Sequence, residues 1–410
     1  MPVPAYKPWL WSIVFILNFK AHSQNPYLAY LNQSTGNSTL TYDSIINYYS
    51  TERLHQPIIP RLSLRTETDE FKLNQQEYSI RAQTGSFSHN KLQNNINKLN
   101  KEEWQIRKRK QIAEQLYKKY NNIVKLVGLS LKIKAQKDFT SSIVKQLELL
   151  NLKSGTGSNV NFEKHLDINL KLLNAKSDLE DLTIKLNTVQ DEIKINQDID
   201  SQFVQFISNE QIVAISNEAY DPKSQTYHAL LENNLSKQQF EFKQDIKDAN
   251  KPLDYIQIHY HDDPIDLVNQ KLTLGAGFRI PMMNSNKKIK DEYELKRLNL
   301  NMDYFEENEK AIRELADLKY QMKRKQTLFS NLEANRQFIL QKFNPETWAL
   351  QELADPVFIA EIRFQLSKIN CDLATTRADI LNLYVHYLFS SGRLFQKPEL
   401  YYLEYPFTEF

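Results

Sequence analysis

The chain has 410 residues, of which 41% are hydrophobic and 25% are charged, so it can bury a sizeable core. Its mean hydropathy of -0.57 excludes a bundle of transmembrane helices, and with it an inner-membrane transporter. The 52 basic and 50 acidic residues are spread along the chain and leave a formal charge of +2, which excludes the basic surface that nucleic-acid binding requires.

The first residues differ in composition from the rest. Lys7 precedes the apolar run 9–17, and the small residues Ala21 and Ser23 follow it. This order is typical of a secretory signal peptide. The alternatives are a buried N-terminal helix or an uncleaved anchor, but the apolar run is too short to span a membrane. We therefore expect export, with a mature chain that begins near Gln24.

Two pairs of strand-like segments lie further along, at 62–67 with 78–84 and at 256–261 with 272–280. In each segment, apolar residues alternate with polar residues or glycine. A period of two predicts strands with one apolar and one polar face.

A proline-free stretch follows each pair, at 88–153 and 285–343, and Gly128 is the only glycine in either stretch. Each is predicted to be a long helix, the first of roughly 65 residues and about 100 Å. Apolar residues with heptad spacing come next and indicate coiled-coil-like helices. The a and d positions of the first are Leu172, Leu179, Leu186, Ile193 and Ala175, Leu182, Val189. Those of the second are Ile359, Leu366, Leu373, Ile380, Tyr387 and Ile362, Ile369, Leu383.

Breaks separate each long helix from its heptad helix. The first is the glycine-containing segment 153–160, and the second is 344–356, which contains two prolines. Because glycine and proline terminate helices, each break is predicted to be the tip of an antiparallel helical hairpin.

The two halves superpose in sequence with one offset. Adding 194 carries Tyr78 to Leu272, Ala82 to Ala276 and His165 to Ile359, which indicates an internal duplication. The predicted organisation is a signal peptide at 1–23, a segment with a short helix at 24–60, a first repeat at 61–196 (β-hairpin 61–87, helical hairpin 88–196), an equatorial segment and linking helix at 197–251, a second repeat at 252–391 (β-hairpin 252–281, helical hairpin 285–391) and a tail at 392–410.

Four strands with one apolar face match a membrane β-barrel, but four cannot close. A closed barrel needs about eight or more, so several copies would have to pool their strands, and three copies would give twelve. The alternative is that each hairpin is a small sheet at the end of a soluble coiled coil.

Leu274–Pro281 is a strand-like segment that ends in a proline ahead of the second long helix, and Ser154–Val160 is the glycine-containing first tip. These two segments resemble the last strand and the first helical tip of the TolC family of outer-membrane efflux proteins, and the resemblance extends over nearly the whole mature length. The resemblance implies a homotrimer with a 12-stranded outer-membrane barrel and a periplasmic α-barrel. It also implies a passive duct that receives substrates from a periplasmic adaptor and an inner-membrane pump, without a cofactor or metal.

The resemblance also suggests site residues. Glu361 falls on one of two positions that narrow and charge the periplasmic entrance in the family, and Phe358 falls on the other. The alternative for Glu361 is an ordinary solvated glutamate on a helix face. The residues expected to contact the adaptor at the tips are Gly155, Thr156, Gly157, Ser158, Asn344, Pro345 and Glu346.

The chain departs from the family pattern in two places. Asn344-Pro345-Glu346 stands where the family usually has glycine, which argues against equivalent docking of the two tips. The helix expected within 40–60 is also shorter than its counterpart at 223–250. A degenerate member without a conducting pore, or an exported soluble coiled-coil scaffold, is therefore the alternative function. A periplasmic adaptor is disfavoured because it would carry a single helical hairpin.

Other sites receive simpler interpretations. His259, His261 and the acidic pair 262–263 could bind a metal, but without a third distant ligand a polar strand end or loop is favoured. The basic run 107–110 is interpreted as a solvated helix face with nearby acidic partners. Cys371 is the only cysteine, which excludes an internal disulfide and a lipoprotein anchor. No catalytic motif is present, so no enzyme is predicted.

Overall fold

A computed structural model describes residues 26–32, 35–51, 59, 61–68, 76–83, 87–155, 162–193, 206–219, 221, 225–250, 253–261, 272–278, 285–349 and 355–409. The predicted signal peptide lies outside these residues. The described chain is mainly helical with a small antiparallel sheet, which confirms the predicted fold class at that level. It divides into two compact units, one from 1–37, 112–221 and 311–410 and the other from 38–111 and 222–310.

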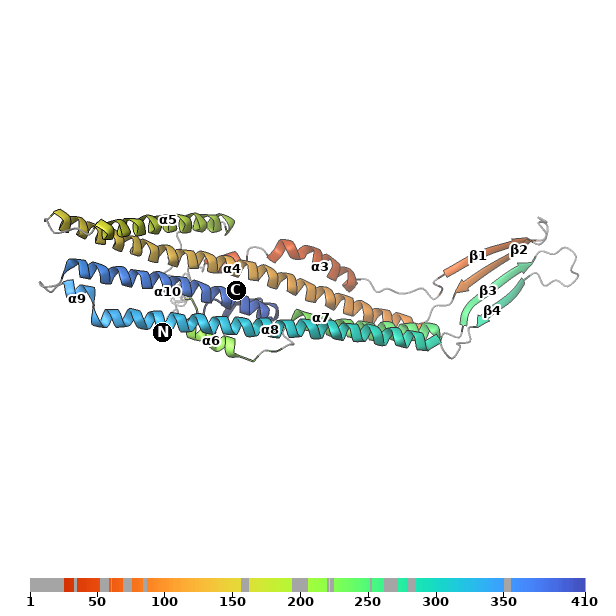
Figure 1. The fold of residues 1–410 in the computed structure, drawn as a ribbon. Coiled ribbons are helices and arrows are strands. Elements are labelled where there is room, and N and C mark those ends of the chain that lie inside the picture. The colour runs from red at the N-terminus through yellow and green to blue at the C-terminus, as the bar shows by residue number, and fades with distance from the viewer. Residues whose placement is uncertain are drawn as a thin grey trace, which may run out of the picture. The chain divides into compact units, whose positions relative to one another are not determined.

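The elements follow one another as the duplication predicts (Figure 1). Those of the first half are α2 (Pro26–Asn32), α3 (Thr35–Thr51), β1 (Arg61–Thr68), β2 (Gln76–Gln83), α4 (Phe87–Gly155) and α5 (Phe162–Ile193). Those of the second half are α6 (Asn209–Asn217), α7 (Thr226–Ala249), β3 (Leu253–His261), β4 (Leu272–Phe278), α8 (Ser285–Lys342), α9 (Pro345–Ala349), α10 (Pro356–Ser390) and α11 (Arg393–Gln396), followed by β5 (Leu400–Tyr401) and β6 (Thr408–Glu409).

The two long helices are present, with α4 extending over 69 residues and α8 over 58. The shorter first helix is also confirmed, because α3 has 17 residues whereas α7 has 24. The offset of 194 that relates the strands also carries Phe162, the first residue of α5, to Pro356, the first residue of α10. The return helices α5 and α10 therefore begin at equivalent positions in the two halves.

Burial along α5 follows the predicted heptad. Ile168, Ala175 and Ile193 are buried, and the predicted positions Leu172, Leu179, Leu182, Leu186 and Val189 are partly buried between exposed neighbours. Gln136 of α4 donates its side-chain amide to the carbonyl of Ala175 at 3.0 Å, which attaches the middle of α5 to α4.

The buried surface of α10 is wider than the predicted heptad positions alone. Its a and d positions are buried or partly buried, but Phe364, Leu381, Tyr384, Val385 and Leu388 are buried as well. The reason is that α10 packs against several elements of the first unit at once. It contacts α4 through a Ser142–Ser367 hydrogen bond, α8 through a Lys325–Asp379 ion pair and α6 through Arg377.

The C-terminal tail forms part of the core of the first unit, which the sequence did not indicate. Tyr401, Tyr402 and Leu403 are buried in the cluster that contains Tyr120 of α4 and Tyr384 of α10. The cluster therefore joins the end of the chain to the long helices and to α2, α5 and α6.

In the second unit, α3 and α7 pack on the beginnings of the long helices. Lys108 of α4 pairs with Asp43 of α3 at 2.6 Å. Asn233 of α7 donates to the carbonyl of Leu99 in α4 at 3.0 Å, and Phe242 of α7 stacks on Tyr293 of α8 with ring centroids 4.4 Å apart.

The four predicted strands form one antiparallel sheet in the order β1-β2-β3-β4 (Figure 1). The first hairpin is β1 with β2, the second is β3 with β4, and β2 pairs with β3. The sheet thus joins the hairpin of one half to the hairpin of the other.

Candidate functional site

One face of the four-stranded sheet is apolar and open in the single chain. The register aligns Leu64, Ile80, Ile258 and Leu274 in one row across the four strands. Leu64 is 69% exposed and Leu274 77% exposed on the outer strands, while Ile80 and Ile258 are 42% and 41% exposed. Exposed apolar residues in the neighbouring rows are Leu62, Tyr78, Ile256 and Leu272. A contiguous apolar face of this kind marks a surface that lipid or another molecule covers.

The other face of the sheet is polar. Its rows contain Arg61, Arg65 and Arg81 on the first hairpin, and uncharged residues such as Gln257 and Thr273 on the second. The alternation predicted from the sequence therefore separates two chemically different faces, as in strands that divide lipid from water.

Both edges of the sheet are open. Among the described strands, β1 pairs only with β2 and β4 pairs only with β3. Each edge strand therefore presents backbone groups that a further strand could pair with.

The first helical tip is only partly described. Helix α4 ends at Gly155, and the predicted tip residues Thr156, Gly157 and Ser158 lie outside the described residues. On either side of the tip, the His165 ring of α5 contacts Asn151 Oδ1 of α4 at 2.8 Å, which joins the two helices of this hairpin.

The second tip contains the short helix α9, which the sequence analysis did not predict. Asn344 accepts the backbone N–H of Glu346 at 3.0 Å, and Pro345 occupies the first helical position, where its missing N–H costs nothing. Asn-Pro-Glu is a recognisable helix start, so the signal was present in the sequence. Glu346 is exposed at this tip, whereas Pro345 is buried.

Three aromatic rings pack together beside α9. Trp348 lies 5.6 Å from Phe358 and 6.1 Å from Phe343 between ring centroids, and Phe343 lies 6.2 Å from Phe358. Phe358, the second expected entrance position, thus joins the start of α10 to the second tip.

Glu361 lies near the start of α10 and is half-buried. Its carboxylate accepts hydrogen bonds from Gln146 of α4 at 2.5 Å and from Gln365 at 2.9 Å. Glu361 therefore has a specific partner on α4, which distinguishes it from a glutamate that faces solvent alone.

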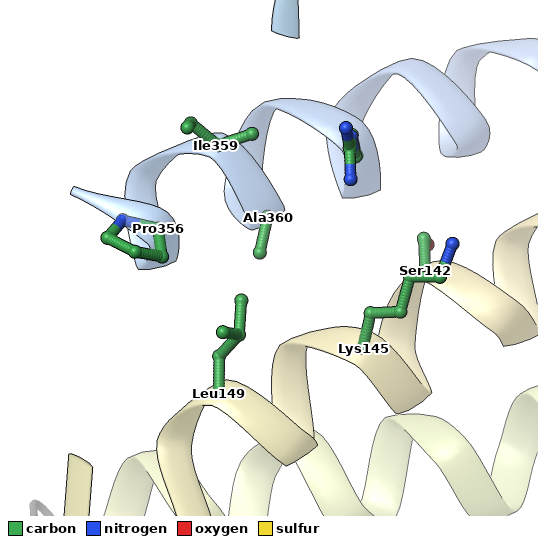
Figure 2. A pocket seen from close by; sticks show the side chains of 7 residues that line it. Ser142, Lys145, Leu149, Pro356, Ile359 and Ala360 are labelled. Carbon is green, nitrogen blue, oxygen red and sulfur yellow. The ribbon is translucent and has the colours of Figure 1, made fainter. Parts of the chain in front are cut away.

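A groove of about 310 Å³ lies between α4 and the start of α10 (Figure 2). Leu149 of α4 points toward Ala360 of α10 across it, and Pro356 and Ile359 form its α10 side. Lys145 and Arg363 also line it, so the groove carries two cationic side chains.

The histidines proposed as possible metal ligands have no completed ligand set in the described chain. His259 lies on the polar face of β3, and no group of three potential ligands lies together among the residues that the structure describes. The His261 side chain and residues 262–263 lie outside the described part.

The basic run on α4 has the acidic partners that were expected. Arg107 donates to Glu103 at 2.7 Å, and Lys108 pairs with Asp43 at 2.6 Å. These pairs attach the run to its own helix and to α3.

The sequence analysis missed one partly buried cation, Arg377, and one buried cation, Lys119, because only the fold brings their partners to them. Arg377 of α10 donates to the side chain of Asn209 and to the carbonyl of Ile207, and burial lowers its pKa to about 10. Lys119 of α4 donates to the carbonyl of Leu31 at 2.5 Å, and burial lowers its pKa to about 8.

None of the described helices combines the length and the apolar character needed to cross a membrane. No protein-family model and no curated protein matches the sequence. Three solved structures have a similar fold. CusC, described in connection with transmembrane channel formation, has a TM-score of 0.56 and 14% sequence identity, with 90% of each chain covered. The outer-membrane channel OprN has a TM-score of 0.57 and 10% identity, with 87% of this chain and 85% of that chain covered, and the outer membrane protein VceC of Vibrio cholerae has a TM-score of 0.57 and 10% identity, with 89% of this chain and 92% of that chain covered.

The chain thus has the fold of a class of outer-membrane channel proteins, over nearly its whole length. The resemblance to the TolC family that the sequence indicated is confirmed at the level of the fold.

Proposed function

We propose that this chain is the outer-membrane channel of an efflux or secretion system, a passive homotrimeric duct in a bacterial outer membrane. The observation that carries the proposal is the apolar face of the four-stranded sheet, which a single chain leaves open. Lipid is the covering that suits it, because strands that alternate apolar and polar residues can face hydrocarbon on one side and a water-filled lumen on the other.

The open edges of the sheet support the pooling of strands between copies. Strands β1 and β4 run in opposite directions in the four-stranded antiparallel order. The β4 edge of one copy can therefore pair with the β1 edge of the next in the antiparallel sense. Three copies give twelve strands and leave no edge, as a spanning barrel requires.

The helical hairpins serve as the periplasmic part of the duct in this proposal. The tips, at Gly155–Ser158 and Asn344–Glu346, contact a periplasmic adaptor coupled to an inner-membrane pump, and Glu361 lines the periplasmic entrance. The hydrogen bond from Gln146 supports this role, because it holds the Glu361 carboxylate at a defined place on α10.

Fractionation of cells that express the full chain tests the proposal. The protein is expected in the outer membrane as a trimer that resists SDS until heated and that crosslinking captures. A soluble monomer would contradict the proposal and support a coiled-coil scaffold.

A matched pair of variants tests which face of the sheet meets lipid. Leu274→Arg places a charge on the apolar face, and Thr273→Arg places it on the polar face of the same strand. A lipid-facing arginine costs about 2–4 kcal/mol near the bilayer midplane, whereas a lumen position tolerates it. We expect only Leu274→Arg to reduce the membrane-inserted trimer. Equal tolerance of both would exclude the barrel.

A further inference from the structure

The charged residues on the polar face of the sheet lie at successive levels, where a level is one row of residues that the register aligns across the strands. Three successive cross-strand levels contain one arginine each, which are Arg61, Arg81 and Arg65, and none of these three levels contains a carboxylate. The fourth level, farthest along the hairpins from α4, contains Glu67 opposite Glu77. One ion pair connects the two zones, between Arg65 and Glu67 at 2.5 Å.

Arg81 is held on the sheet by stacking. Its guanidinium carbon lies 3.2 Å from the centroid of the Tyr255 ring on β3. Its Nε is buried and has no hydrogen-bond partner among the described residues, so the ring rather than an acid determines its position.

A glycine provides the space for that ring. A Cβ at Gly277 of β4 would lie 2.2 Å from Cε1 of Tyr255, so a side chain there would displace the ring. At Gly275, two residues earlier on the same face, a Cβ would meet Gln257 only at 3.8 Å, an ordinary contact. Gly277, Tyr255 and Arg81 thus form a cross-strand stack over β4, β3 and β2.

We infer that Arg61, Arg65 and Arg81 make the sheet an anion-favouring passage, and that the substrates of the duct carry negative charge. The inference rests on the proposed function, because the polar face becomes a lumen only when several copies close the barrel. In a trimer each of the three levels contains three arginines. Arginine is charged at every physiological pH, and rings of arginine or lysine select anions in pores.

Ion selectivity of the purified full-length protein in planar bilayers tests this inference. In a KCl gradient, the reversal potential of the wild-type protein is expected to show a preference for chloride. Replacing Arg61, Arg65 and Arg81 together by glutamine is expected to lower the chloride-to-potassium permeability ratio to one or below. The matched triple replacement by lysine retains the charge and is expected to retain the preference.

A matched pair of glycine variants tests the role of the Gly277–Tyr255–Arg81 stack. Gly277→Ala is expected to lower the ratio in the direction of Arg81→Gln, because it displaces the ring that holds Arg81. Gly275→Ala adds the same methyl group on the same strand and is expected to leave the ratio unchanged.

The outcomes separate the two proposals. A membrane-inserted protein that carries no current overturns the proposed function and this inference with it. A conducting protein whose reversal potential is the same before and after the triple glutamine replacement overturns the inference alone. Contributions from charges elsewhere in the duct, such as Glu361, are common to all variants and cancel in the comparison.

Discussion

Tyr120 of α4 connects the long helix to the C-terminal segment of the same unit. Its side chain is fully buried. Its hydroxyl donates to the carbonyl of Leu400 at 2.9 Å and accepts the N–H of Tyr402 at 3.2 Å. Its ring also stacks on Tyr401 with centroids 6.4 Å apart. Burial raises the pKa of Tyr120 far above its ordinary value, so the hydroxyl remains protonated and able to donate.

Tyr120→Phe retains the ring and removes only the hydroxyl. Two hydrogen bonds of about 1 kcal/mol each are lost, and the Tyr402 N–H is left buried without this acceptor, for a total of about 2–3 kcal/mol. Since 1.4 kcal/mol is a factor of ten, opening of segment 400–403 should become roughly 30- to 150-fold more frequent.

Hydrogen exchange of the peptide that contains Tyr402 measures this opening. The control is Tyr117→Phe, one turn earlier on α4, where the ring stacks on Phe389 at 4.6 Å and the described residues supply no partner for the hydroxyl. We expect faster exchange in Tyr120→Phe only. Equal exchange in the two variants would refute the role of the Tyr120 hydroxyl.

Three further predictions concern buried positions of the first unit. A Cβ at Gly128 of α4 would lie 2.9 Å from that of Ala378 on α10. Gly128→Ala should therefore lower the free energy of unfolding by about 1 kcal/mol net of helix propensity, measured as a lower urea midpoint, and adding Ala378→Gly should restore it. The lowered pKa of Lys119, about 8 against 10.5, means that the unfolded chain binds more protons between these values. Stability relative to Lys119→Met should therefore rise as the pH increases from 8 toward 10.5, and parallel urea midpoints of the two proteins would contradict this. Arg377→Met should cost about 2–3 kcal/mol and increase hydrogen exchange in α6, because the carbonyl of Ile207 loses its donor; unchanged exchange there would exclude this anchoring role.

The periodic parts of the fold could be predicted from the sequence because their signals are local and repeated. Strand alternation identified both hairpins, and the scarcity of glycine and proline located α4 and α8 within a few residues. Periodicity also identified the buried face of α5, which is a single stripe of heptad positions.

The remaining features depend on contacts between distant segments. Helix α10 has a wider buried surface than its heptad because α4, α6 and α8 all meet it. The partner of Glu361 is Gln146, 215 residues away in the chain, so no spacing rule could indicate that pair. The C-terminal tail gave no pattern, yet Tyr401 and Leu403 are fully buried.

The predicted duplication accounts for the two similar hairpins of the sheet but not for the distribution of their charges. The offset of 194 carries Arg61 to Tyr255 and Arg81 to Gly275, so the second hairpin lacks the arginines of the first. One of these replacements supplies the ring on which Arg81 lies, and a glycine on the next strand leaves room for it. The two hairpins therefore share a backbone pattern and have complementary side chains. In a closed barrel, hairpins that carry these arginines would alternate around the lumen with hairpins that lack their counterparts, so the loss of symmetry between the halves is what would place the arginines at regular intervals.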